Sequence, residues 1–453
     1  HGAFAQQIVA PASALIRMTD TMDFDTAAAL TLTYGTSHHA VVDRAQLQAG
    51  ETMLVLGAAV TVTAAALLLA ERDMKAVIGN QQYALLSSAA SHMDEHLAAK
   101  KAMLATLARI EAVKAVGAGA EQEEFPFFRE FWVEAPEANA DKATIHALVD
   151  SESVAGAFRF EIWPGAESVL EVNATLHVRK AGVKLGLAPL TSMFFIGEND
   201  RHMNDRNKYD EFRTELHDSD GLMIHTADNE WIWRPLKNPL VQEVQRYDTR
   251  NVRGFGLFQR DRRYEHYMDI ELAYEERPSY WIEPKEDWGS GVVELVELAT
   301  KDETADNIVC AFVPDGPVDP GKPFTFSYRI HSINDGLDLH ALAKVTNTFN
   351  APAYALGSNE QQAGNARRFM VDFAGGEMDY YLKNPGLVKI VASARNARIF
   401  RTFLVPNPKG QGFRAMIDVK FEDNQVGTVR AFLSSGQKPL TETWSYSWRI
   451  YNF

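Results

Sequence analysis

Cysteine is almost absent from this 453-residue chain, which has a single one, Cys310. One cysteine excludes an internal disulfide and any metal site built from several thiolates. Cys310 stands in the apolar run VCAFV. A cysteine in such a run is most often a small core residue, and the alternative is a reactive nucleophile.

Positive charge and long hydrophobic runs are scarce as well. Lys and Arg number 45 against 60 Asp and Glu, a net charge of −15. Phosphate binding needs clustered Lys and Arg, so we expect no nucleic-acid partner, and the balance suits a neutral ligand such as a sugar. The most apolar segment, 60–70, is too short to span a bilayer, and no signal peptide is visible at the start. We therefore expect a soluble protein without membrane insertion.

The pattern of the sequence changes near residue 117. Residues 1–116 are rich in Ala and Leu and predict an atypical helix-rich segment around one buried strand at 52–59. Short alternating runs separated by turn residues follow, among them 144–150, 157–163 and 324–332. They predict a mainly β protein.

Two β units follow the N-terminal segment in this prediction. The first is a large antiparallel β-sandwich over 117–340, and the second is a smaller Ig-like sandwich over 341–453. The Pro- and Gly-rich segment 313–323 is expected to be a hairpin connection inside the first.

The N-terminal segment contains MDFDTAAALTLTYGTSHHAVVDRAQLQAGETMLVLGAA at 22–59. It resembles a fragment of the zinc-free quinone oxidoreductases of the medium-chain dehydrogenase superfamily. In that family the LVLGAA strand leads into a glycine-rich turn, because only a bare backbone can approach the pyrophosphate of NADPH. Here Val60, Thr61, Val62 and Thr63 follow instead. We therefore expect no cofactor, and a reductase is the weakest of the functions considered.

The stretch ELATKDETADNIV, 297–309, holds four acids within ten residues: Glu297, Asp302, Glu303 and Asp306. It is either a polar turn that Asp306 caps or a set of carboxylates in a site. Buried carboxylates this close would raise at least one pKa. We assign Glu297 to the preceding strand and Asp302 to the turn.

Three further segments, 197–213, 215–236 and 254–291, combine aromatic rings with carboxylates and Arg. This mixture is typical of carbohydrate clefts, where rings stack on sugars and fixed polar groups bind the hydroxyls. The stacking candidates are Trp231, Trp233, Tyr264, Tyr267 and Trp281, and the hydroxyl-binding candidates are Gln259, Arg262 and Arg263. The alternation in EWIWRP predicts that one of Trp231 and Trp233 is core and that the other lines a face. His217, His225 and His266 lack the tight spacing of metal ligands, so no metal is expected.

These segments also carry a specific resemblance. The motifs APLTSMFF, ELHDSDGL, EWIWRPL, GFGLFQRDR, RPSYWIEPKEDWGSG, VELVEL and DETADNIV occur in order from 123 onward. Over this region the chain resembles the periplasmic glucan biosynthesis proteins of types G and D. The resemblance implies a large β-sandwich followed by an Ig-like domain, a periplasmic location, and a role in making osmoregulated glucans of β-1,2-linked glucose.

The resemblance also implies roles for individual residues. D-type members are inverting β-1,2-glucanases, and their general acid matches Asp306, with Glu303 as a supporting acid. Asp218 matches the carboxylate of the water-activating side, and Tyr274 and Arg277 match residues that line the cleft. His217, next to Asp218, is counted with them as a substrate-binding residue. The expected partner is β-1,2-linked glucan, and a homodimer is one option for assembly.

Two alternatives stay open. The family's cleft could cleave glucan, or it could bind glucan without catalysis as an assembly factor. The dehydrogenase-like segment also stands where the family has the first part of its large sandwich, which predicts a sandwich with open sheet edges.

Overall fold

The computed structural model describes residues 126–134, 140–165, 167–200, 211–316, 318–333, 339–354, 365–422 and 425–450. All of them lie in the second of the two units into which the chain divides, Ala84–Phe453. The helix-rich, dehydrogenase-like segment predicted for 1–116 falls outside the described residues. The described chain is mainly β with antiparallel sheets, which confirms the predicted fold class.

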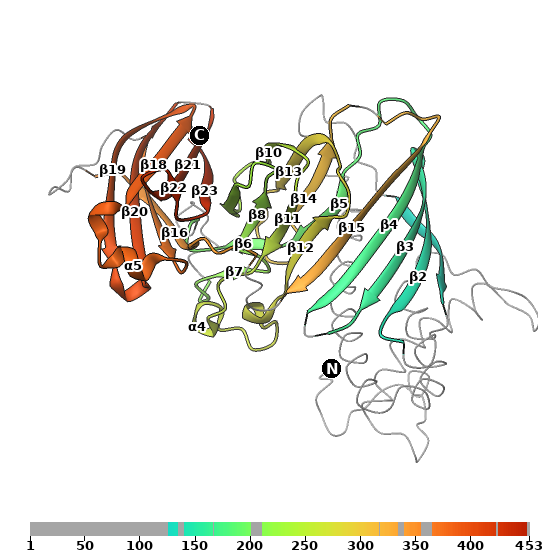
Figure 1. The fold of residues 1–453 in the computed structure, drawn as a ribbon, viewed down its shortest axis with the longest axis horizontal. Coiled ribbons are helices and arrows are strands. Elements are labelled where there is room, and N and C mark those ends of the chain that lie inside the picture. The colour runs from blue at the N-terminus through green and yellow to red at the C-terminus, as the bar shows by residue number, and fades with distance from the viewer. Residues whose placement is uncertain are drawn as a thin grey trace, which may run out of the picture. The chain divides into compact units, whose positions relative to one another are not determined.

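One 13-stranded sheet runs through the described chain. Its first nine strands all pair antiparallel with their neighbours. In spatial order they are β1 (Phe127–Val133), β2 (Ala143–Asp150), β3 (Val154–Trp163), β4 (Ser168–Val178), β15 (Pro323–Ile333), β12 (Ser279–Pro284), β11 (Gly254–Phe258), β8 (Gly221–His225) and β9 (Trp231–Pro235). Figure 1 shows β2, β3, β4 and β15 side by side, from cyan to gold.

A second sheet packs on one face of this large sheet and completes the first sandwich. Its order is β10 (Glu243–Arg250), β13 (Ser290–Glu297), β14 (Ile308–Pro314) and β5 (Leu187–Ser192). Alternate residues of each strand point inward, because side chains alternate across a strand. Phe255 and Ile282 of the large sheet thus share a buried core with Val293, Leu295 and Phe312 of the second sheet. Each such burial stabilises the fold by roughly 1.5–3 kcal/mol.

The predicted hairpin at 313–323 is wrong. β14 ends at Pro314 in the second sheet, whereas β15 begins at Pro323 in the large sheet. Each strand pairs with other neighbours, β14 with β13 and β5, and β15 with β4 and β12. The Pro- and Gly-rich segment therefore crosses from one layer of the sandwich to the other.

A second sandwich follows in the chain. The large sheet continues into it through β23 (Thr443–Arg449), β21 (Val426–Ser435), β18 (Lys389–Arg395) and the short β22 (Lys438–Pro439). The facing sheet has the order β16 (Lys344–Pro352), β17 (Ala366–Ala374), β20 (Gly412–Phe421) and β19 (Ala397–Asn407). Short helices α5 (Met378–Leu382), η5 (Pro385–Leu387) and η6 (Pro408–Gly410) connect these strands.

The two sandwiches meet along β9 and β23, which pair in parallel with Trp233 opposite Trp444. Aromatic side chains of the first sandwich, including Trp281 and Phe258, join the core of the second. The exact boundary between the units, predicted at 340/341, and the Ig-like character of the second remain predictions.

Two small elements lie between the larger ones and carry site residues. β6 (Phe194–Ile196) and β7 (Leu216–His217) form a two-stranded sheet, and α4 (Tyr264–Tyr267) and η4 (Tyr274–Glu276) follow β11. Met268 and Ala273, between α4 and η4, have left-handed backbone angles, with φ of 53° and 42°. Such non-glycine residues cost of order 1 kcal/mol each and cluster at functional sites. Within the described residues, we find no helix of the length and apolarity needed to cross a membrane.

Candidate functional site

The acidic stretch at 297–309 begins as a strand and continues as a loop between β13 and β14. Glu297 ends β13 fully buried, where its Oε2 lies 2.7 Å from Nη2 of Arg234 and its Oε1 accepts the Lys237 N–H. Burial raises the pKa of Glu297, and Arg234 opposes that rise. Asp302 accepts hydrogen bonds from the backbone and hydroxyl of Thr304. Glu297 is therefore a structural strand residue and Asp302 a turn residue, as predicted.

Asn307 fixes the end of this loop, one residue after Asp306. Its side-chain amide is buried, accepts from the Phe194 N–H at 2.8 Å, and donates to the carbonyls of Phe194 and Leu298 at 3.0 Å each. These bonds join the loop to β6. Asp306 itself is half-buried. Sequence reasoning passed over Asn307 because an Asn in a polar stretch gives no sign of its burial.

Asp218 directly follows β7, and its N–H donates to the Met193 carbonyl at 2.9 Å. Its Oδ1 lies 3.3 Å from Nε of Arg277. Burial raises the pKa of Asp218, while the charges of Arg277 and His217 pull it down. Asp218 is therefore a better proton acceptor than an exposed aspartate, with a cation beside it that favours its ionised form.

Glu303 is joined to this pair through Tyr274. The Tyr274 hydroxyl donates to Oε2 of Glu303 at 3.1 Å, and the Arg277 guanidinium lies 5.5 Å from the Tyr274 ring centroid. Arg213 contacts the same oxygen of Glu303 at 3.0 Å. Four of the residues predicted from motifs far apart in the sequence, Asp218, Tyr274, Arg277 and Glu303, thus form one connected group.

Arg213 holds three carboxylates at once, which sequence reasoning missed. Besides Glu303 it contacts Glu211 at 2.8 Å and Asp269 at 2.7 Å. Its own segment, 197–213, is one of the three segments that combine aromatic rings with carboxylates and Arg, and nothing in the sequence distinguishes Arg213 among its charged residues. Because Asp269 follows α4, Arg213 connects the loop that carries Glu303 to α4.

His217 and Gln259 form a buried support beneath Asp218 and Tyr274. The His217 Nδ1–H donates to Oε1 of Gln259 at 2.9 Å. Nε2 of Gln259 lies 2.9–3.0 Å from the carbonyls of His217 and Tyr274 and from the Tyr267 hydroxyl, so that these three acceptors share its two hydrogens. His217, Gln259 and Tyr267 were predicted as substrate contacts, but all three are buried. They hold the residues of the site in place and do not present a surface to a ligand.

Comparison with known proteins identifies the family of the chain. The family model for periplasmic glucan biosynthesis protein, MdoG, matches residues 98–448, which is more than half of the chain. The chain belongs to the periplasmic glucan biosynthesis protein family.

It is similar to the probable glucans biosynthesis protein D of Shewanella oneidensis, with 44% identity over 328 residues, covering 72% of this chain and 59% of the relative. It is also similar to the glucans biosynthesis protein G of Pseudomonas paraeruginosa, with 42% identity over 330 residues, covering 72% of this chain and 62% of the relative. The chain thus spans about three fifths of the length of these glucan biosynthesis relatives.

A glucan-binding cleft in this family member would need exposed rings, and most of the predicted ones are buried. Trp231 and Trp233 are 7% and 3% exposed, so the prediction that one of them lines an open face is wrong. Residues two apart in a strand share a face, and the second sandwich covers this one. Trp281 stacks beside Trp231 with ring centroids 5.7 Å apart, and Arg260 covers the Trp233 ring. The rings of Trp231, Trp233 and Trp281 are therefore too buried to stack on a sugar, contrary to the prediction.

The remaining predicted contacts lie nearer the surface. Tyr264, on α4, is 43% exposed. Arg262 donates to the Glu275 carbonyl at 2.8 Å, and Arg263 forms an exposed ion pair with Asp261 at 2.9 Å. Tyr264 is thus the predicted stacking residue whose position suits a sugar.

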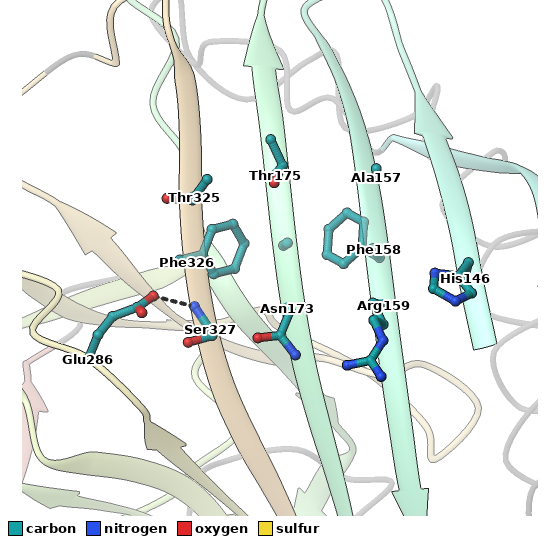
Figure 2. Close-up of a pocket in the computed structure, with 11 residues that line it drawn as sticks. His146, Ala157, Phe158, Arg159, Asn173, Thr175, Glu286, Thr325, Phe326 and Ser327 are labelled. Atoms are coloured by element: carbon teal, nitrogen blue, oxygen red, sulfur yellow. Dashed lines mark hydrogen bonds between the residues drawn. The ribbon is translucent and has the colours of Figure 1, made fainter. Parts of the chain in front are cut away.

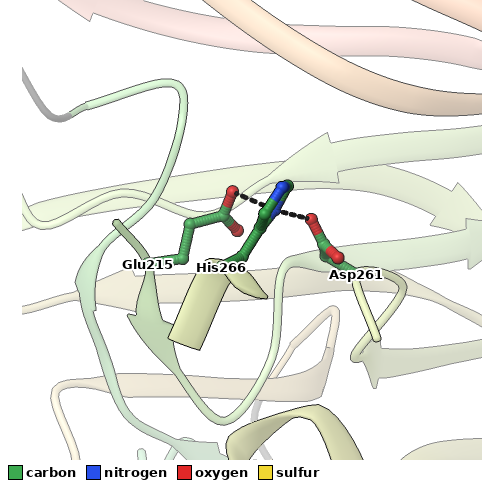
Figure 3. A group of neighbouring side chains, drawn as sticks. All are labelled: Glu215, Asp261 and His266. Carbon is green, nitrogen blue, oxygen red and sulfur yellow. Dashed lines mark hydrogen bonds and ion pairs between the residues drawn. The ribbon is translucent and has the colours of Figure 1, made fainter. Parts of the chain in front are cut away.

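Two groups of side chains in this glucan biosynthesis protein have the composition of metal sites. Glu215, Asp261 and His266 form one, shown in Figure 3, and Glu215, His217 and Asp220 form the other. Nδ1 of His266 lies 2.6 Å from Asp261 Oδ2 and 3.1 Å from Glu215 Oε1, which are hydrogen-bond separations. Burial lowers the pKa of His217, but Asp220 and Glu215 overcome it and raise the pKa to about 9. A protonated His217 ring donates to carboxylates and does not ligate a metal, and the separations around His266 are those of hydrogen bonds. That no metal is bound stays a prediction.

Proposed function

We propose that this chain acts on β-1,2-linked glucan in the periplasm as an inverting endo-glucanase, with Asp306 as general acid and Asp218 on the water-activating side. Inversion needs a protonated carboxyl on one side of the glycosidic bond and an ionised one on the other. The observation that carries the proposal is the connected group formed by Asp218, Arg277, Tyr274 and Glu303. Asp306 follows Glu303 by three residues in the chain.

The proposed reaction divides the work between the two carboxyls. Asp306 gives its proton to the glycosidic oxygen as the bond from that oxygen to the anomeric carbon breaks. A water attacks that carbon from the opposite face, and its proton passes to Asp218. Arg277 holds Asp218 ionised before the step, because a cation favours the charged carboxylate. Each turnover consumes one water and produces one new reducing end.

The neighbouring residues support these two roles. Tyr274 and Arg213 fix the Glu303 carboxylate by a hydrogen bond and an ion pair. Glu303 in turn lies in the same loop as Asp306, three residues before it. Asn307 holds the backbone next to Asp306. A buried and connected scaffold of this kind suits an acid that must keep one position.

The test is to incubate the protein with linear β-1,2-glucan and to measure new reducing ends and the anomer first formed. We expect the wild type to release the inverted anomer and Asp306→Asn to lose about 10²–10⁴-fold in rate, the usual contribution of a general acid. Asp302→Asn is the matched control, since Asp302 is an exposed turn residue of the same loop.

The outcomes separate this proposal from the alternative. If the wild type releases no reducing ends but still binds the glucan, the site is a binding site for an assembly factor of glucan synthesis. If Asp302→Asn is as inactive as Asp306→Asn, the assignment of the acid is wrong.

A further inference from the structure

A second polar surface lies on the large sheet, outside the group of Asp218 and Glu303. One residue from each of five adjacent strands is aligned there by the strand register. The row consists of Trp132 on β1, His146 on β2, Arg159 on β3, Asn173 on β4 and Ser327 on β15. Strands lie about 4.8 Å apart, so the row extends roughly 19 Å across the sheet. We call these five residues the polar row.

The polar row faces away from the core of the first sandwich. A chain neighbour of each member belongs to a second row of apolar residues that the same register aligns. These neighbours are Phe131, Phe158 and Phe326, which come before their members of the polar row, and Ala147 and Ala174, which come after theirs. Ala174 and Phe326 lie in the buried core of this sandwich, and Phe158 packs against it. Because neighbours along a strand point to opposite faces, the polar row lies on the other face of the sheet. Figure 2 shows His146, Arg159, Asn173 and Ser327 across neighbouring strands.

A cavity of about 360 Å³ lies over this face. Its lining includes His146, Arg159, Asn173 and Ser327 of the polar row together with Thr175 and Thr325 beside them. This volume falls in the range of small-ligand sites, roughly 300–1,000 Å³. Asn173 lies in the paired interior of β4, and its side-chain amide makes no hydrogen bond to the residues that the structure describes, so the amide can serve a ligand.

The charges around the polar row favour a neutral ligand. Arg159 is paired with Glu161 at 2.7 Å, and His146 lies 2.6 Å from Glu134. Glu286, also in the lining, accepts the Ser327 N–H at 2.6 Å. Since Arg159 is already paired with a carboxylate, the described residues that line the cavity offer no free guanidinium or ammonium group of the kind that a phosphate needs.

Trp132 supplies the apolar part of such a site. It lies opposite His146 on β1 and is 51% exposed. An exposed ring next to hydrogen-bonding side chains suits the two faces of a sugar, which has apolar C–H groups and polar hydroxyls. We propose that the polar row is a second, non-catalytic binding surface for a neutral, hydroxylated chain, namely a distant part of the glucan held at the catalytic group. This inference rests on the proposed function for the identity of the chain.

The experiment uses the full chain with Asp306→Asn, so that no ligand is cleaved. Calorimetry compares a short linear β-1,2-gluco-oligosaccharide, which fills only the catalytic group, with a long one, which also reaches the polar row. We expect the added pair Trp132→Ala and Asn173→Ala to weaken binding of the long chain about tenfold, since a ring contact and a hydrogen bond are lost. Binding of the short chain stays unchanged, and Trp132→Phe, which keeps a ring, retains the affinity for the long chain.

Tyr380→Ala is the matched control, because Tyr380 is an exposed ring on α5 in the second sandwich. The inference is overturned if the double variant binds the long chain as tightly as its parent, or if Tyr380→Ala weakens it equally. It is also overturned if long and short chains lose affinity together, which would make the row part of the catalytic cleft. Failure of the proposed hydrolysis would appear separately, as a wild type that releases no reducing ends from a glucan it binds.

Discussion

His217 is fully buried between two carboxylates, with Nε2 lying 3.1 Å from Glu215 and 3.4 Å from Asp220. Its pKa of about 9 stands above the ordinary value of 6.5, although burial alone would lower it. A pKa that is raised on folding stabilises the fold below the unfolded value, and the stabilisation is lost as the pH rises through the folded value. The ring therefore stabilises the protein at pH 6.5 and below and loses this effect toward pH 9.

We expect the free energy of unfolding to fall between pH 6.5 and 9, by an amount of the order of 3 kcal/mol from this group. His217→Gln should remove most of that fall and should itself be less stable at pH 6.5. Denaturant unfolding at several pH values measures it. His177→Gln, at an exposed position of β4, is the control and should keep the wild-type pH dependence. A His217→Gln variant with an unchanged fall would assign the dependence to other groups.

At the level of single elements, the loop that carries Glu303 and Asp306 depends on the strand before it. Glu297, the last residue of β13, is buried against Arg234 of β9, and Arg234 also donates to Ser447 of β23. Lys237 extends this contact, because its ammonium bonds Glu243 and the Ser447 carbonyl. One buried network thus fixes the start of the acidic loop to both sandwiches.

Glu297→Gln should therefore destabilise the protein strongly, since it leaves the buried Arg234 without its counter-charge. Loss of one partner of a buried pair costs about 3–5 kcal/mol. Glu294→Gln, on the same strand but in a pair with the exposed Arg246, should cost much less. Denaturant unfolding of both variants gives the comparison, and hydrogen exchange in 298–307 shows whether the loop loosens. Equal costs for the two would contradict a special role for Glu297.

The strands themselves were readable from the sequence, whereas their partners were not. Alternating runs at 144–150, 157–163 and 324–332 correspond to β2, β3 and β15, because a period of two is a local property of a half-buried strand. The hairpin at 313–323 failed because it depends on which sheet each end joins. The burial of Trp231 and Trp233 likewise depends on the second sandwich, which no local pattern reveals.

The residues of the candidate site could likewise be predicted only in part from the sequence. Motifs in three distant segments indicated Asp218, Tyr274 with Arg277, and Glu303, and the structure joins these residues. The role of Arg213 could not be predicted from its own segment, because it depends on contacts with three carboxylates, two of which belong to other segments. His217 and Gln259 are polar residue types typical of a binding site, but the sequence does not show that they are buried. Direct contact with the substrate was therefore predicted for them, whereas in the structure they support the backbone of the site.

At the scale of the whole described molecule, the two sandwiches are held together by a buried ion pair besides the β9–β23 pairing. Glu442, just before β23, contacts Nη1 of Arg260 at 2.5 Å, and Arg260 stacks on Trp233 of the first sandwich. Glu442 also accepts the Val345 N–H of β16 at 2.6 Å. Burial alone would raise the pKa of Glu442, but Arg260 and these hydrogen bonds hold it at about 2, below the usual 4.5.

A carboxylate whose pKa falls on folding stabilises the protein above its unfolded value, and the stabilisation is lost as the pH falls through the folded value. Glu442 should therefore stabilise the contact between the sandwiches at pH 4.5 and above and release it toward pH 2. We expect Glu442→Gln to lower the unfolding midpoint at neutral pH and to flatten its dependence between pH 4.5 and 2. Glu377→Gln is the control, since the Glu377–Lys438 pair is exposed. Because Arg260 would remain buried without its partner, the neutral-pH loss should reach about 3–5 kcal/mol. A variant as stable and as acid-sensitive as the wild type would mean that the shared aromatic core, and not this ion pair, holds the sandwiches together.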